Sequence, residues 1–130
     1  MLSLPQAVRI LLCTRHADLR KSFDGLAQLV REYLGADPLS GHLFVFLNKR
    51  GDRLKLLYWD SDGYAIFYKR LEVGTFKLPQ AKAARAQAGE HGVVLRSAEL
   101  TMLLDGIDLV NTKRRKRYQR PPLSGAATAQ

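Results

Sequence analysis

The chain has 130 residues and a mass of 14.6 kDa, which is enough for one domain with a single core and short for two. It carries 21 Lys and Arg against 12 Asp and Glu, and the net charge of +9 favours a partner with an anionic surface. Its one cysteine, Cys13, excludes an intrachain disulfide, and no stretch of about 18 consecutive apolar residues predicts a membrane span. We therefore expect a soluble, cytoplasmic protein with no membrane partner.

The N-terminal third predicts a strand followed by a helix. Val8–Cys13 is apolar and β-branched, which is typical of a buried strand. Asp18 stands where an N-cap belongs, and apolar residues then recur at helical spacing as far as Gly35. This pattern predicts one long helix over residues 18–34.

Three consecutive short strands come next, and they form the most informative part of the sequence. We expect strands over His42–Leu47, Arg53–Trp59 and Tyr64–Arg70, joined by a loop at Asn48–Asp52 and a turn at Asp60–Gly63. Within the second of these strands the alternation of polar and apolar residues shifts its phase. The shift predicts a bulge that re-aims the two aromatic residues at the end of that strand.

The remainder of the chain carries weaker signals. Thr75–Leu78 could add a short strand, and residues 80–92 have no firm apolar period, so they are expected to form a mobile connection, although their Ala content would permit a helical turn or two. Val93–Leu95 is expected to return as an edge strand, and Ser97 to begin a short helix that ends near Gly106.

These elements predict a single α+β domain over residues 1–110, in which one long helix packs on a small, mainly antiparallel meander sheet and a short helix closes the core. Residues 111–130 cannot bury enough apolar surface to offset the entropy of ordering, so we expect a disordered basic tail. Six of the nine net positive charges fall in this tail, with no acid among them: Lys113, Arg114, Arg115, Lys116, Arg117 and Arg120.

Cations and aromatic residues are interleaved along the predicted meander. Surfaces of this kind can hold a nucleic-acid backbone and stack on bases. The candidate nucleic-acid contacts are therefore the six tail cations together with Arg50, Arg53, Lys55, Lys69, Arg70 and Lys77, and the candidate stacking residues are Tyr58 and Trp59. Adjacent residues of a regular strand face opposite ways, so only one of this aromatic pair would be exposed. The alternative interpretation is that the rings belong to the core and the cations are ordinary strand exteriors.

A second cationic cluster brackets the start of the predicted helix: Arg15, His16, Arg20 and Lys21. The free N–H groups of a helix N-terminus attract anions, which makes this cluster a secondary anion site. Asp18, as the predicted cap, would compete with an anion for the same groups.

Enzyme chemistry has little support in the sequence. The three histidines, His16, His42 and His91, fall in separate segments, and there is no second cysteine for a metal site. Asp60 and Asp62 are typical turn formers, and no glycine-rich phosphate loop is present. We expect no catalytic activity, no cofactor, no metal and no small-molecule substrate.

Several segments, in order along the chain, carry a resemblance to a known family: Asp18–Leu26, Asp37–Phe46, Asp52–Asp60, Tyr68–Glu72 and, more weakly, Leu103–Ile107. They closely resemble the TnpB accessory proteins encoded by insertion sequences of the IS66 family. The resemblance implies a small auxiliary product that works beside a separate transposase and is unrelated to the RNA-guided nucleases of the same name. It implies no catalytic residue.

Charge and resemblance together predict a transposition accessory protein that binds DNA, first of all transposon ends, without breaking a bond. The tail would grip phosphates without reading sequence. The rival hypothesis is a protein-interaction module that docks on the transposase or another product of the same element, with the tail only aiding solubility.

Overall fold

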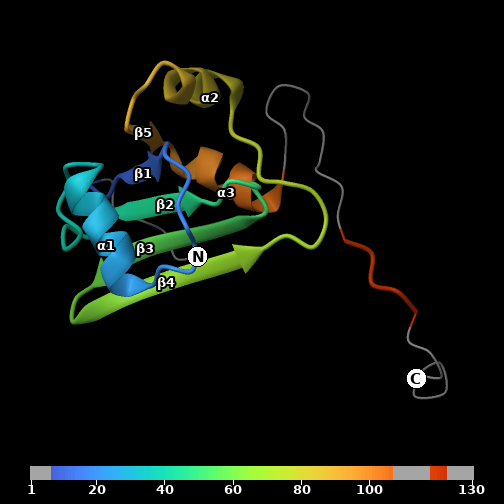
Figure 1. Ribbon diagram of the computed structural model, residues 1–130, viewed down its shortest axis with the longest axis horizontal. Coiled ribbons are helices and arrows are strands. Elements are labelled where there is room, and N and C mark those ends of the chain that lie inside the picture. The colour runs from blue at the N-terminus through green and yellow to red at the C-terminus, as the bar shows by residue number, and fades with distance from the viewer. Residues whose placement is uncertain (1–6, 107–117, 123–130) are drawn as a thin grey trace.

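The computed structural model describes residues 7–106 and 118–122 (Figure 1). In chain order these residues form β1 (Ile10–Cys13), α1 (Phe23–Glu32), β2 (Leu43–Leu47), β3 (Arg53–Asp60), β4 (Gly63–Arg70), α2 (Gln80–Gln87), β5 (Gly92–Leu95) and α3 (Ser97–Asp105). The strands form one sheet in the order β4-β3-β2-β1-β5. Only β1 and β2 pair in parallel, so the prediction of an α+β fold with a mainly antiparallel sheet is confirmed.

The predicted meander is β2-β3-β4, and all three of its strands lie where the sequence placed them. The predicted bulge in β3 is wrong, because the register with β4 runs without an inserted residue from Arg53 opposite Arg70 to Asp60 opposite Gly63. The apolar run that suggested a bulge has another cause. Leu56 packs in the apolar cluster on one face of the sheet and Leu57 in the cluster on the other, so two adjacent apolar residues are both buried in a regular strand.

The predicted long helix is wrong in length, since α1 has only ten residues and begins at Phe23. The carboxylate of Asp18 accepts a hydrogen bond from the N–H of Arg20 at 3.0 Å, which makes a local turn in place of a helix cap. Ser22 occupies the N-cap position instead. The helix then lies across the strands, from the side of β4 towards β1 (Figure 1).

Two apolar clusters cover the two faces of the sheet. On one face, side chains of α1 such as Leu26 and Val30 pack on Phe44, Phe46 and Leu57. On the other face, Leu100 and Leu103 of α3 join Leu12, Val45 and Leu56. With both faces covered, β2 is apolar throughout and carries no polar alternation.

The C-terminal elements agree with the prediction in part. Val93–Leu95 does form an edge strand, β5, and α3 ends at Gly106 with a left-handed φ of 78°. Thr75–Leu78 forms no strand; Phe76 instead packs into the core. Residues expected to be a mobile connection form the helix α2, which buries none of its side chains.

Most of the predicted basic tail lies outside the described residues, including five of its six cations, Lys113, Arg114, Arg115, Lys116 and Arg117. Residues 118–122 form neither helix nor strand, and Arg120 among them is exposed. Among the described helices, none has the length and apolar character needed to cross a membrane.

Candidate nucleic-acid interface

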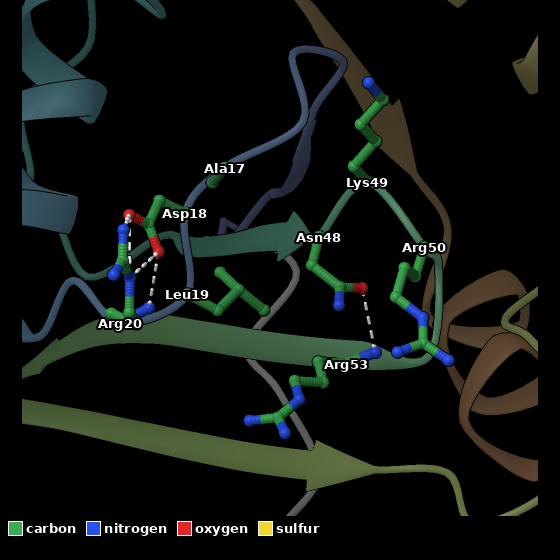
Figure 2. A pocket seen from close by; sticks show the side chains of 8 residues that line it. All are labelled: Ala17, Asp18, Leu19, Arg20, Asn48, Lys49, Arg50 and Arg53. Atoms are coloured by element: carbon green, nitrogen blue, oxygen red, sulfur yellow. Dashed lines mark hydrogen bonds and ion pairs between the residues drawn. The ribbon is translucent and has the colours of Figure 1, made fainter.

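Four cationic side chains line a hollow at one end of the sheet (Figure 2). The hollow has a volume of about 480 Å³ and lies between the segment that precedes α1 and the loop that joins β2 to β3. Its lining residues are Ala17, Asp18, Leu19, Arg20, Asn48, Lys49, Arg50 and Arg53. We call this the basic hollow.

The wall from the β2–β3 loop is shaped by the side chain of Asn48. Its oxygen accepts a hydrogen bond from the N–H of Arg53 at 3.0 Å (Figure 2). Its amide nitrogen donates to Asp52 at 2.7 Å. The N–H of Gly51 closes the loop on the Asn48 carbonyl at 3.0 Å, with a φ of 76° that favours glycine. This fixed loop holds Lys49 and Arg50 at its exposed tip.

The opposite wall is held to the sheet by backbone and apolar contacts. The N–H of Ala17 donates to the carbonyl of Leu47 at 2.9 Å, and the side chains of Ala17 and Leu19 are buried. Between them, Asp18 and Arg20 form a two-pronged ion pair with N–O distances of 2.8 to 3.1 Å. Hydrogen bonds from Arg20 lower the pKa of Asp18 to about 2, so the pair is charged at neutral pH.

The remaining cations of the hollow are less fully neutralised. Arg53 donates a hydrogen bond of 2.7 Å to the neutral hydroxyl of Tyr68. The pKa of Asp52 is lowered first by its hydrogen bond from Asn48, and also by the charges of Arg50 and Arg53. Lys49 makes no hydrogen bond or ion pair with any residue in the described part of the chain. The hollow therefore presents net positive charge.

Two further cations extend this surface. Arg70 lies opposite Arg53 in the β3–β4 register and pairs with Glu72 at 2.7 Å. Lys77 is brought close because the N–H of its neighbour Phe76 donates to the carbonyl of Gly51 at 2.8 Å. We call the resulting surface the basic end of the sheet, made of Arg20, Lys49, Arg50, Arg53, Arg70 and Lys77.

Two of the predicted contacts are structural ties instead. Lys55 is only 8% exposed, and its ammonium donates to the carbonyl of Lys21 at 2.8 Å. Lys69 is half-buried on the other face, where its ammonium donates to the carbonyl of Leu104 at 3.0 Å. Each amine is engaged by a segment that covers the sheet, so we leave both residues out of the interface proposed below.

The candidate stacking residues lie away from the basic end. Tyr58 and Trp59 do face opposite ways: Tyr58 packs against the α3-side cluster, and Trp59 meets Tyr64 edge-on at 5.2 Å. They lie at the far end of β3 from Arg53, about 20 Å away at the rise of a strand. The aromatic residue at the basic end is Tyr68, which is 45% exposed.

The predicted second cationic cluster is divided by the fold. Arg20 lines the basic hollow, whereas the guanidinium of Arg15 lies 5.7 Å from the ring of Tyr33, which stacks on His91 at 4.3 Å. α1 begins at Phe23 with Ser22 as its N-cap, so Lys21 is the member of this cluster that directly precedes the start of the helix. His16 and Lys21 are exposed, and Lys21 contributes its carbonyl to Lys55.

Lys49 is the basic-end residue that the sequence prediction missed. Its position beside Arg50 in a polar loop was the available signal. Within residues 7–106 and 118–122, no group of three His, Cys, Asp or Glu side chains is placed to hold a metal ion.

Comparison with known proteins relates the sequence of this chain to a family. Residues 8–114 match a family model described as IS66 Orf2-like protein. Two similar proteins from Sinorhizobium fredii are both described as uncharacterized. The protein y4hO is 39% identical over 108 residues, covering 83% of this chain and 88% of its own length. The protein y4jC is 36% identical over 121 residues, covering 93% and 97%. No solved structure matches the chain significantly.

Proposed function

Because the chain belongs to the family of IS66 Orf2-like proteins, we propose that it is a transposition accessory protein that binds the DNA of its insertion sequence without cleaving it, and so assists a separate transposase. The observation that carries this proposal is the convergence of cations from three chain segments at the basic end of the sheet. Within that DNA, the proposed binding sites are the ends of the element.

The chemistry of the basic end suits a phosphate backbone. Guanidinium groups can pair with two phosphate oxygens at once, and Arg50 and Arg53 place two of them around one hollow, beside Arg20, which Asp18 engages. Lys49, at the exposed tip of the loop, adds a point charge with freedom to reach a neighbouring phosphate. Contacts of this kind position a protein on DNA and carry no sequence information by themselves.

The tail is proposed to strengthen the same interaction. In this scheme residues 1–110 form the domain that orients DNA, and residues 111–130 add sequence-independent attraction through their cations. Arg120, the one tail cation among the described residues, is exposed. Salt dependence then measures how many phosphates the two parts engage.

The test is a salt titration of binding to two labelled duplexes, one from an end of the element and one of scrambled sequence. With four to six phosphates engaged, the slope of log affinity against log salt should be roughly −4 to −5. Lys49→Ala combined with Arg50→Ala should make the slope shallower by about 2, one unit for each lost contact. Truncation after Asn111 should reduce it further.

The matched control removes two positive charges elsewhere. Arg9 and Arg31 are exposed, lie outside the basic hollow and form no salt bridge with the described residues. The double variant Arg9→Ala and Arg31→Ala loses the same net charge but no proposed phosphate contact. Its salt slope should therefore stay close to that of the wild type. If both double variants lose affinity equally, or if the full chain does not bind at physiological salt, the protein-docking role is favoured and the transposase becomes the partner to test.

A further inference from the structure

Strand β4 forms one edge of the sheet, and no described strand lies beyond it. The N–H of Leu71 donates to the carbonyl of Asp52 at 2.7 Å, which shows that odd-numbered residues here direct their backbone towards β3. The backbone groups of the even-numbered residues therefore face outward: Tyr64, Ile66, Tyr68 and Arg70. Such a row of unpaired donors and acceptors is a template for another strand.

The middle of this edge strand lacks the features that protect edge strands. The five residues Tyr64–Tyr68 carry no charge and no proline, and the register with β3 has no bulge. Proteins normally place at least one such feature on an edge strand to prevent pairing. Phe67 is 45% exposed, which adds apolar surface beside the open backbone.

The charges at the two ends of β4 are opposite. Asp60 and Asp62 lie at the turn where the strand begins, and Lys69 and Arg70 lie where it ends. An antiparallel copy would bring each acidic end beside a basic end, whereas a parallel copy would bring like charges together. We propose that β4 pairs antiparallel with β4 of a second copy of this chain, joining two five-stranded sheets into one.

The register follows from the same features. With Ile66 opposite Ile66 of the second copy, outward-facing residues pair with outward-facing residues, and Tyr68 lies opposite Tyr64. Arg70 then lies opposite Asp62. A shift by one residue would set Ile66 against Phe67, whose side chains belong to opposite faces of the sheet. A shift that sets Phe67 opposite itself would leave Asp62 beyond the paired region and Arg70 opposite Tyr64.

This pairing does not depend on DNA binding and is measured without DNA. It has one geometric consequence for the proposed function. Because the strands run in opposite directions, the two basic ends would lie at opposite ends of the joined sheet.

The test is sedimentation equilibrium of the full chain over a range of concentrations. The wild type should be a dimer. Asp62→Arg or Arg70→Asp should each raise the dissociation constant of the dimer about tenfold, because the symmetric interface contains the Asp62–Arg70 pair twice and each substitution disrupts both. The double variant with both substitutions should restore much of the wild-type value. Arg31→Asp, a charge reversal on α1, should leave the dissociation constant unchanged.

A second pair of variants tests the backbone. Ile66→Pro removes an outward N–H that the β3 ladder does not use, while Ile66→Thr retains it. We expect the proline variant to be monomeric and the threonine variant dimeric, both with folded circular dichroism spectra. A wild type that stays monomeric at every concentration would overturn the proposal, as would single charge reversals without effect or a proline variant that dimerises as well as the threonine variant.

Discussion

The ammonium group of Lys55, in the interior of β3, donates a hydrogen bond of 2.8 Å to the backbone carbonyl of Lys21. It also lies 4.7 Å from the centre of the Tyr68 ring, and the residue is only 8% exposed. The contact joins the central part of the sheet to the segment that leads into α1, so a lysine that sequence alone assigned to DNA contributes to the fold.

Replacing Lys55 by methionine should therefore lower stability while leaving DNA binding unchanged. The loss of a charge-assisted hydrogen bond is expected to cost about 1 to 3 kcal/mol in the free energy of unfolding. Urea unfolding measures it as a lower midpoint at an unchanged slope. Lys49→Met, at the exposed loop tip, is the control. It should leave the free energy of unfolding unchanged and weaken DNA binding. A fully stable Lys55→Met variant would contradict the structural role.

Asp18→Asn should strengthen DNA binding. Asp18 holds Arg20 in a charged pair, and the neutral amide would release the guanidinium to a phosphate. We expect affinity to rise severalfold at low salt, and the salt slope to steepen by up to about 0.9 for one more phosphate contact. Asp37→Asn removes the same charge near the start of β2, at the opposite end of that strand from the hollow, and should have a smaller effect. Equal effects would indicate a response to net charge alone.

Arg20→Ala should raise the pKa of Asp18 from about 2 towards its ordinary value of 3.8. The side-chain hydrogen bond from Arg20 is the main cause of the low value, and the backbone N–H of residue 20 would remain as a lesser one. Carboxyl chemical shifts followed by NMR from pH 6 to 1.5 would report it. Because the folded pKa is depressed, the pair stabilises the fold fully above pH 3.8 and ceases to do so as the pH falls through 2.

Glu99 should make stability depend on pH in the acid range. Burial alone would raise its pKa, but the hydrogen bond from the Arg96 N–H at 2.8 Å and the charges of Lys82 and Arg96 outweigh burial and hold it below 4.5. Its contribution should be complete above pH 4.5 and decline as the pH falls through the lowered value. Glu99→Ala is expected to cost about 1 to 3 kcal/mol at neutral pH, measured by urea unfolding.

Glu99→Gln is the matched variant for this prediction. Glutamine can still accept the Arg96 N–H in the capping box, but it cannot titrate. It should retain part of the stability and lose the part of the dependence on acid pH that comes from Glu99, while the part from Asp18 remains. Parallel pH profiles for the wild type and Glu99→Gln would exclude Glu99 as the titrating group.

The meander was predictable because its signals are local. Alternation and short turns fix β2, β3 and β4 within a few residues of each other. The start of α1 was not predictable in this way. An Asp whose side chain accepts a hydrogen bond from the N–H two residues further along forms a turn as readily as it caps a helix. The prediction of a bulge was wrong for a related reason, because the sequence alone does not show that β3 is covered on both faces.

The site was predictable only in part. Arg50 lies in the β2–β3 loop and Arg53 begins β3 directly after it, so their proximity follows from chain order. Arg20 lies beside them because the N–H of Ala17 donates to the carbonyl of Leu47, which ties the segment before α1 to the end of β2. No sequence pattern predicts this contact between distant residues. Lys55 has the same alternation as Arg53, and only the covering segment distinguishes their roles.

The position of β1 also constrains how the chain can mature during synthesis. Ile10 lies between Leu43 and Leu95, so both neighbours of this strand come from far along the chain. The meander can close as soon as residue 70 leaves the ribosome, whereas β1 keeps one open edge until Val93–Leu95 emerges. A nascent chain that stalls before Gly92 would leave the apolar strand β1 at an open edge of the sheet, where the finished domain has β5.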